Sequence, residues 1–194
     1  YIQFNNEPWR IIGIFNGQAK IIRNDYYSTS IAWNSTNKNA SDSTNDWSIA
    51  TLQETLNTEY LSSIDDTSKS LIDNTHAWKL GGQNSATVGQ WTRVNMYSKE
   101  RGNSVPLGSS KVWTGAIGIM YPSDYGYATS STNTVCNTTT MNSWSSGIAT
   151  TECRDKNWLY SSSNVQWTLT PYSGGAGTNT VFCVNTHGFV SNPS

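Results

Sequence analysis

Charge is scarce in this chain. Asp, Glu, Lys and Arg make up 13% of the residues, against roughly 25% in a typical soluble domain. The formal net charge is −1 and the pI is about 6.1. The sequence therefore has neither the basic stripe that neutralises nucleic-acid phosphates nor a polybasic patch for anionic lipid. We expect no nucleic-acid partner and no attraction to a membrane surface.

Long apolar runs are also missing. No stretch approaches the ~18 apolar residues that a membrane-spanning helix needs. The first residues, Tyr1-Ile2-Gln3-Phe4, match neither a signal peptide nor an initiator methionine. The sequence is what we expect of an excised ectodomain, extracellular or at the cell surface, that does not itself insert into a membrane.

Histidine is rare, which limits catalysis. The chain has His76 and His187, and no G-x-S-x-G, H-E-x-x-H or paired C-x-x-C motif. Neither a serine triad nor a transition-metal centre is expected, both histidines are interpreted as structural, and no catalytic residue is assigned. Glycosidases need two carboxylates across a cleft, for which Glu7, Glu100 and Asp124 are the candidates.

Aromatic and small polar residues are abundant instead. The chain contains 9 Trp and 10 Tyr, and more than a third of it is Ser, Thr or Asn. Because disordered segments contain few aromatics, the chain is expected to fold. Its 194 residues are enough for one domain, residues 1–194, with a core of its own.

The strand patterns begin with a hairpin. Residues 8–25 alternate around Asn16-Gly17, which predicts two strands joined by a type I′ turn. Apolar residues on both faces favour a central place for this hairpin in a sheet. Further strands are predicted at residues 76–80, 91–97, 116–121, 166–171 and 181–190.

Two helices are predicted in the first half. Asp46 or Ser48 is expected to cap the first, whose apolar face carries Ile49, Leu52, Leu56 and Tyr60. The second spans residues 65–74 and turns Leu71 and Ile72 inward. Residues 26–45 read as a loop anchored by Trp33. Helices followed by short strands and long surface loops indicate an α+β fold.

Three blocks carry a resemblance to known proteins. They are residues 4–17 (FNNEPWRIIGIFNG), 113–129 (WTGAIGIMYPSDYGYAT) and 158–192 (WLYSSSNVQWTLTPYSGGAGTNTVFCVNTHGFVSN). They resemble a large group of secreted or surface domains of Gram-positive bacteria, many of which follow a prepilin-type helix. The resemblance implies a C-type-lectin-like or formylglycine-generating-enzyme-like fold. It also implies a leader helix before residue 1 and a short strand containing Gly-Val-Arg-Pro after residue 194, so that one terminal strand is missing or replaced.

The resemblance bears on the cysteines as well. Related sequences often carry a pair where Cys136 and Cys153 bracket a Ser/Thr/Asn-rich loop, which implies a disulfide between them. Closing such a loop would stabilise the fold by roughly 3 kcal/mol in the chain-entropy model and fits an extracellular setting. Cys183 lies in an apolar run and is interpreted as a buried, inert thiol; a reactive thiol is the alternative.

Calcium is the cofactor to consider for a lectin-like chain. Many C-type lectins hold Ca²⁺ with Glu-Pro-Asn or Gln-Pro-Asp and a later Trp-Asn-Asp, and none of these strings occurs here. Asp42, Asn45 and Asp46 offer oxygen ligands for a hard cation, but a solvated turn is the preferred interpretation. We therefore expect no cofactor, with calcium as the alternative.

Loops that combine aromatic and small polar residues form the predicted ligand surface, because paratopes use the same combination. We expect this surface after about residue 130 and at residues 171–179, with Trp144 and Tyr172 exposed. The candidate ligand-binding residues are Trp144, Tyr172, Ser173, Asn179 and Tyr125. Core packing is the alternative interpretation for Tyr121, Tyr125 and Tyr127. For Trp9, Trp113, Trp158 and Trp167 we predict core packing.

These observations favour a non-enzymatic binding or adhesion domain. We expect the globular head of a pilin-like or cell-surface protein that recognises a glycan or a protein through its C-terminal loops. A structural filament subunit that contacts identical subunits is the first alternative. An oxidoreductase-like enzyme that acts through Cys183 is the second.

Overall fold

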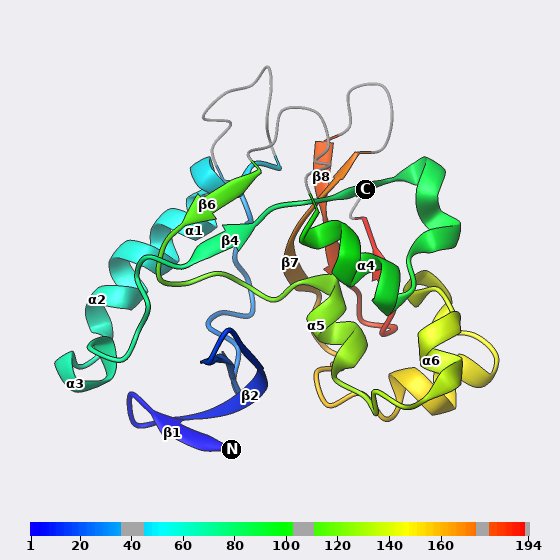
Figure 1. Ribbon diagram of the computed structural model, residues 1–194, viewed down its shortest axis with the longest axis horizontal. Coiled ribbons are helices and arrows are strands. Elements are labelled where there is room, and N and C mark those ends of the chain that lie inside the picture. Colours follow the sequence, from blue (N-terminus) through cyan, green and yellow to red (C-terminus); the bar gives the residue numbers. More distant parts are fainter. Residues whose placement is uncertain (36–44, 103–110, 174–178, 193–194) are drawn as a thin grey trace.

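The computed structural model describes residues 1–35, 45–102, 111–173 and 179–192, which form an α+β structure with helices on both sides of a central sheet (Figure 1). The sheet has the order β5-β7-β8-β9. Its strands are β5 (Gln83–Asn84), β7 (Gln166–Ser173), β8 (Asn179–Val184) and β9 (Val190–Ser191). β5 runs parallel to β7, whereas the other pairs are antiparallel. The strand predicted at residues 166–171 is thus confirmed, whereas residues 181–190 form part of β8 and the start of β9, with a turn between them.

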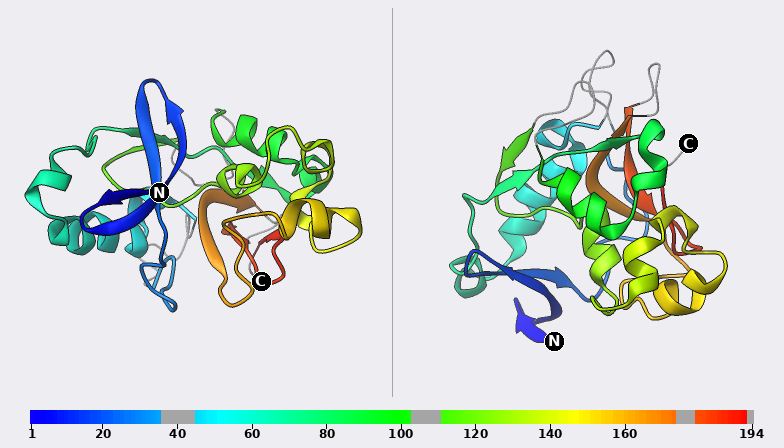
Figure 2. Two further views of the ribbon diagram at one scale, coloured as in Figure 1. Left: turned by 90° about the horizontal axis from the view of Figure 1, so that it is seen from below. Right: turned by 45° about the vertical axis from the view of Figure 1, so that its right-hand side comes forward.

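A separate three-stranded sheet opens the chain and lies at one side of the molecule (Figure 2). It consists of β1 (Ile2–Phe4), β2 (Glu7–Phe15) and β3 (Gln18–Arg23), in that order. Asn16 and Gly17 have φ angles of 51° and 80°, the left-handed conformations that a type I′ turn needs. The predicted hairpin is confirmed, although only β2 is central in its sheet and β3 lies at an edge.

The first helical layer runs from η1 (Trp47–Ile49) through α1 (Thr51–Thr55), η2 (Leu56–Tyr60) and α2 (Leu61–Ser63). Asp46 caps it, because its Oδ1 accepts the Ser48 N–H at 2.9 Å. The predicted apolar face is buried at Leu52, Leu56 and Tyr60.

The next helix, α3 (Asp66–Lys69), is shorter than predicted. The Asp65 carboxylate caps it by accepting the Ser68 N–H at 2.9 Å. Because α3 ends at Lys69, Leu71 is 76% exposed and its predicted inward position is wrong, whereas Ile72 packs against the core.

A two-stranded sheet pairs β4 (Ala77–Lys79) with β6 (Val112–Thr114). The strand predicted at residues 116–121 does not form. The Asn57 side chain there accepts the Ile117 N–H and donates to the Ile117 carbonyl, both at 2.9 Å. One amide thus replaces a partner strand for this extended segment.

The second helical layer lies where the sequence predicted strands and loops. It comprises η3 (Ser85–Gln90), α4 (Arg93–Glu100), α5 (Pro122–Tyr127), α6 (Thr134–Thr138), η4 (Met141–Ser143) and η5 (Thr150–Arg154). The strand predicted at 91–97 is wrong: the Thr92 hydroxyl caps α4 by accepting the Asn95 N–H at 3.3 Å. Arg93, Met96 and Glu100 are buried at helical spacing. No helix in the described residues is long and apolar enough to cross a membrane.

Strands β7 and β8 lie between two hydrophobic clusters and contribute side chains to both. On β8, Phe182 and Val184 enter one cluster and Val181 enters the other, as expected from side chains that alternate across a strand. We call the first the C-terminal cluster, which contains Trp91, Met96, Tyr125, Trp144, Phe182 and Val184 among others. The second is the N-terminal cluster, which contains Trp9, Trp33, Trp47, Leu52, Leu56 and Val181 among others.

The disulfide and a buried arginine close the C-terminal cluster. Cys136 and Cys153 are bonded, with 5.5 Å between their Cα atoms, as the resemblance implied. Arg93 is 0% exposed. Its guanidinium donates to the carbonyls of Gly126, Ser130, Ser131 and Asn133, to Thr129 Oγ1 and to Asn137 Oδ1. Arg93 thereby fixes the segment between α5 and α6.

Candidate functional site

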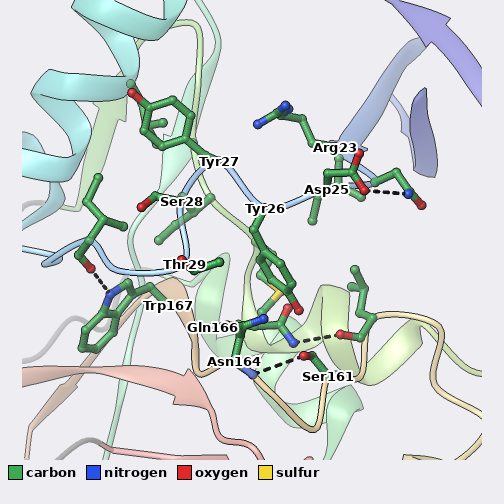
Figure 3. A pocket seen from close by; sticks show the side chains of 18 of the residues that line it. Arg23, Asp25, Tyr26, Tyr27, Ser28, Thr29, Ser161, Asn164, Gln166 and Trp167 are labelled. Carbon is green, nitrogen blue, oxygen red and sulfur yellow. Dashed lines mark hydrogen bonds between the residues drawn. The ribbon is translucent and has the colours of Figure 1, made fainter. Parts of the chain in front are cut away.

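An open groove lies between two irregular segments (Figure 3). Residues 24–32 and 158–167 supply its walls, and residues 117–120 also line it. Its volume is about 940 Å³, near the upper end of the ~300–1,000 Å³ that is usual for ligand sites. Such a groove can hold several sugar rings or a short peptide.

Hydrogen bonds from buried or half-buried side chains hold both walls. The first wall is attached to β7, because the Trp167 indole N–H donates to the Ile31 carbonyl at 2.9 Å. Nearby, the Trp33 indole N–H donates to the Thr168 carbonyl at 3.2 Å. In the second wall, the Gln166 amide donates to the Leu159 carbonyl at 2.8 Å. The central sheet therefore positions both walls, although residues 24–32 and 158–165 form neither a helix nor a strand.

Exposed aromatic rings face the groove. Tyr26 is 43% exposed and Trp158 is 37% exposed. Figure 3 shows the Tyr26 ring pointing from its own wall toward the segment that carries Gln166. The Tyr27 ring instead packs edge-on against the Tyr60 ring, with 5.3 Å between the ring centroids. Ser28, Thr29, Ser161 and Asn164 add hydroxyl and amide groups to the lining.

One buried donor at the groove lacks a partner. Trp9 lines the groove and is 9% exposed, and its indole Nε1 makes no hydrogen bond within the described part of the chain. A buried N–H without an acceptor costs about 1–3 kcal/mol. Because this nitrogen is shielded from solvent, it is an unsatisfied donor inside the N-terminal cluster and not a contact open to a bound molecule.

Two of the charged side chains that line the groove, Lys20 and Arg23, are paired. Lys20 Nζ lies 2.5 Å from Asp124 Oδ2, and Arg23 Nε lies 2.9 Å from Glu7 Oε2. Tyr60 also contacts this second pair, and burial raises the pKa of its hydroxyl to about 12. The groove thus presents few unpaired charges and many neutral polar groups.

The predicted ligand residues lie elsewhere, mostly in the core. Trp144 is 0% exposed and Tyr172 is 6% exposed, so the expectation that both are exposed is wrong. Trp144 packs on Tyr125 at 5.8 Å, and Tyr172 packs on Phe182 at 5.2 Å. The loop that carries Trp144 folds inward because the disulfide and Arg93 hold it against the C-terminal cluster.

The remaining predicted ligand residues do not line the groove either. Tyr125 is 0% exposed and its hydroxyl donates to the Gly188 carbonyl at 2.8 Å, which agrees with the core alternative. The backbones of Ser173 and Asn179 pair across β7 and β8, and their side chains lie outside the described part of the structure.

The calcium alternative gains no geometric support. Asp42 lies outside the described residues. Asn45 and Asp46 are 1% and 7% exposed, so the expectation of a solvated turn is wrong. The Asn45 amide donates to the Tyr172 carbonyl at 3.2 Å, while Asp46 caps η1. No group of three or more His, Cys, Asp or Glu side chains in the described ranges could hold a metal ion.

Two of the three carboxylates proposed for a glycosidase converge on the start of α5. Glu100 Oε1 accepts the Ser123 N–H at 2.9 Å, and Asp124 Oδ2 accepts the Tyr121 N–H at 2.7 Å. Glu100 is 0% exposed, and its burial raises its pKa to about 7. Glu7 instead pairs with Arg23. None of the three lines the groove. Their contacts fit roles in helix capping and ion pairing better than a role in cleaving a ligand.

Cys183 and the histidines have structural surroundings. The Cys183 thiol lies 3.4 Å from Ser191 Oγ, and burial raises its pKa, which lowers the thiolate fraction that a nucleophile needs. His76 packs edge-on against Trp78 at 5.0 Å. His187 lies in the turn before β9, 6.3 Å from the Phe189 ring.

Sequence reasoning missed the groove residues. Trp158 was assigned to the core and Tyr26 to a plain loop. The available signal was the Tyr26-Tyr27 pair followed directly by Ser28, Thr29 and Ser30. The same combination of aromatic and hydroxyl residues predicted a ligand surface in the C-terminal loops. At residues 26–30 no strand or helix pattern indicates that the rings are buried.

The chain matches no protein-family model, no curated protein and no solved structure. The interpretation of the groove therefore rests on the residues that line it. They offer ring faces, hydroxyls and amides, which suits non-covalent recognition.

Proposed function

We propose that the chain is a non-enzymatic binding domain that is displayed at the cell surface and recognises a glycan in the groove. The observation that carries this proposal is the exposure of Tyr26 and Trp158 over the groove. A pyranose ring can lay its C–H face on such rings, which combine an apolar body with a polar end. Around them, Ser28, Thr29 and Asn164 can exchange hydrogen bonds with sugar hydroxyls.

The proposed setting is the globular head of a pilin-like or cell-surface protein with a C-type-lectin-like fold. The Cys136–Cys153 disulfide suits an oxidising extracellular compartment. Recognition in this proposal does not use calcium, because neither Asn45 nor Asp46 lines the groove. The groove side chains supply the contacts instead.

A glycan array probed in calcium and again in EDTA tests this function. We expect selective binding that survives EDTA. In the Tyr26→Ala and Trp158→Ala variants it should fall at least about tenfold, the equivalent of about 1.4 kcal/mol. Tyr97→Ala is the matched control, because Tyr97 is 39% exposed on α4 and does not line the groove.

Two results would contradict the proposal. Binding that disappears in EDTA would indicate a calcium lectin with ligands other than the groove side chains. Unchanged binding by both groove variants would show that the ligand sits elsewhere on the domain.

A filament subunit is the second candidate function. Exposed isoleucines on β2 favour it: Ile11 is 49% exposed and Ile14 is 64% exposed, and apolar surface of this kind can pack against an identical subunit. Light scattering on the purified domain, with Ile14→Glu as the variant, separates the two. Self-association that Ile14→Glu abolishes would favour the filament, and a monomer at high concentration would count against it.

A further inference from the structure

Arg10 stands at the groove with its guanidinium packed on aromatic rings. Its Cζ lies 4.5 Å from the Tyr1 ring centroid and 5.0 Å from the Trp158 ring centroid. Its Nε donates to Asn24 Oδ1 at 3.1 Å, and its Nη2 donates to the Tyr1 hydroxyl. These contacts fix the guanidinium plane while leaving the group at the groove lining.

Part of the guanidinium is free. Arginine carries five N–H donors, and the hydrogen bonds of Arg10 use Nε and Nη2. Its Nη1 donates to nothing in the part of the chain that the structure describes. Two N–H groups on Nη1 and one on Nη2 are thus left, and one from each nitrogen can bind the two oxygens of a carboxylate through parallel hydrogen bonds.

The other cations of the groove are already neutralised. Lys20 pairs with Asp124 and Arg23 pairs with Glu7, whereas Arg10 has no carboxylate within ion-pair distance among the described residues. Asp25 lies on the same rim but reaches Arg10 only through Asn24, whose Nδ2 donates to Asp25 Oδ1 at 3.1 Å. Arg10 is therefore the cation that an incoming anion can pair with, and Asp25 is an exposed charge of the opposite sign beside it.

We infer that the groove selects acidic glycans, and that Arg10 binds the carboxylate of a uronic-acid or sialic-acid type of sugar. The sugar ring then lies along the wall that carries Trp158, with its hydroxyls toward Ser161 and Asn164. This inference rests on the proposed glycan function and adds the chemical class of the ligand. A sugar is favoured over an acidic peptide because hydroxyl and amide groups, together with exposed ring faces, dominate the lining.

Matched pairs of glycans test this inference on the full 194-residue chain. One pair is 3′-sialyllactose and lactose; the other is oligogalacturonate and its methyl ester. We expect the carboxylated member of at least one pair to bind about tenfold or more tightly than its neutral partner, because a charge-assisted bidentate contact is lost in the neutral sugar. This preference should shrink as NaCl rises, since the contact lies at the surface.

Two variants on the same rim give opposite predictions. Arg10→Gln should abolish the preference for the acidic member, measured as the ratio of the two affinities in the same variant. Asp25→Asn should raise that ratio, because it removes a charge that repels the acidic member. Arg10→Lys should keep part of the preference, since it retains the charge and loses the planar fork. Thermal melting of each variant verifies that it is folded.

The outcomes separate the inference from the function on which it rests. Equal binding of acidic and neutral members, or a preference that survives in folded Arg10→Gln, overturns the inference and leaves glycan binding standing. Absence of binding to every glycan by the folded domain overturns both. Saturable binding of hexaglutamate with no binding of either acidic glycan would assign Arg10 to a protein ligand and overturn the choice of a sugar.

Discussion

The C-terminal cluster and the groove use the same residue types in opposite ways. In the cluster, Trp144 is fully buried and its indole N–H donates to the Thr139 carbonyl at 3.3 Å. In the groove, Tyr26 and Trp158 are exposed on segments without regular structure. Both regions are rich in aromatic, Ser, Thr and Asn residues. The difference lies in closure: a disulfide and a buried arginine draw one region inward, and nothing comparable among the described residues draws in the other.

The comparison shows that composition alone does not separate a loop whose rings pack in the core from a loop whose rings stay exposed. One disulfide joins the two ends of the segment 136–153. Residues 24–32 are held mainly at their ends, by Asn24 on Pro8 and by Trp167 on Ile31. Breaking the closure of the cluster, and removing the rings of the groove, should therefore affect different properties of the protein.

Replacing Arg93 should produce the largest loss of stability. Arg93→Ala removes a fully buried side chain and leaves carbonyls of residues 126–133 without their donor. We expect the free energy of unfolding to fall by about 4 kcal/mol, from the cavity and the unsatisfied acceptors together. Urea titration followed by tryptophan fluorescence measures the change.

Arg154→Ala is the control for this prediction, because Arg154 pairs at the surface with Asp155. We expect it to change stability by about 1 kcal/mol or less. Similar effects of the two substitutions would show that Arg93 does not close the cluster.

Removing the disulfide should be the next largest effect. The Cys136→Ser/Cys153→Ser double variant opens a loop with a sequence separation of 17 residues, which in the chain-entropy model corresponds to about 3 kcal/mol. Trp144 should then become accessible, and its fluorescence should shift toward that of a solvated indole and be quenched by iodide. If Trp144 stays shielded in the folded variant, packing rather than the covalent bond keeps this region closed.

Stability should also depend on pH through Glu100. Burial raises its pKa in the folded protein to about 7 from an ordinary value of 4.5, so the folded state holds a proton that the unfolded chain releases. The free energy of unfolding should therefore fall by about 2 kcal/mol as pH rises from 5 to 7 and level off above pH 7. Glu100→Gln keeps an acceptor for the Ser123 N–H and should remove most of this slope. Denaturation midpoints at pH 5, 6, 7 and 8 provide the measurement, and an equal slope in the variant would contradict it.

The groove rings should contribute the least to stability. Tyr26→Ala removes a side chain that is 43% exposed, and we expect a loss of about 0.5 kcal/mol or less. The same substitution is predicted to weaken glycan binding at least about tenfold, as stated above. A large loss of stability without a change in binding would show that Tyr26 belongs to the packing side of the comparison.

Local sequence signals predicted those elements that are locally determined. Asn16-Gly17 specified the turn of the first hairpin, because its left-handed backbone suits few other residue pairs. Asp46 specified the start of the first helical layer through a cap that spans two residues. β7 and β8 followed from short aromatic-rich and apolar runs, which suit a strand that is buried on both faces and, in β8, contributes to two clusters.

Non-local contacts decided the elements that were predicted wrongly. The aromatic and β-branched residues of 91–97 favoured a strand, but Thr92 caps a helix that buries Arg93 against carbonyls more than 30 positions away. Trp144 was expected to be exposed and is buried, whereas Trp158 was expected to be buried and is exposed. The exposure of a tryptophan depends on which distant residues cover it and not on its own neighbours in sequence. Local sequence could have drawn attention to one wall of the groove, but it could not predict that the two walls meet, since they are 126 or more positions apart in the chain.

The strand β8 makes the two clusters energetically inseparable. Phe182 and Val184 point into one cluster and Val181 into the other, so neither half can lose its packing without exposing a face of the same backbone. Unfolding should then occur in one step, and a ligand held in the groove would raise the melting temperature of the distant disulfide half as well. Recognition on one side of the sheet and covalent closure on the other would thereby protect a single folded state.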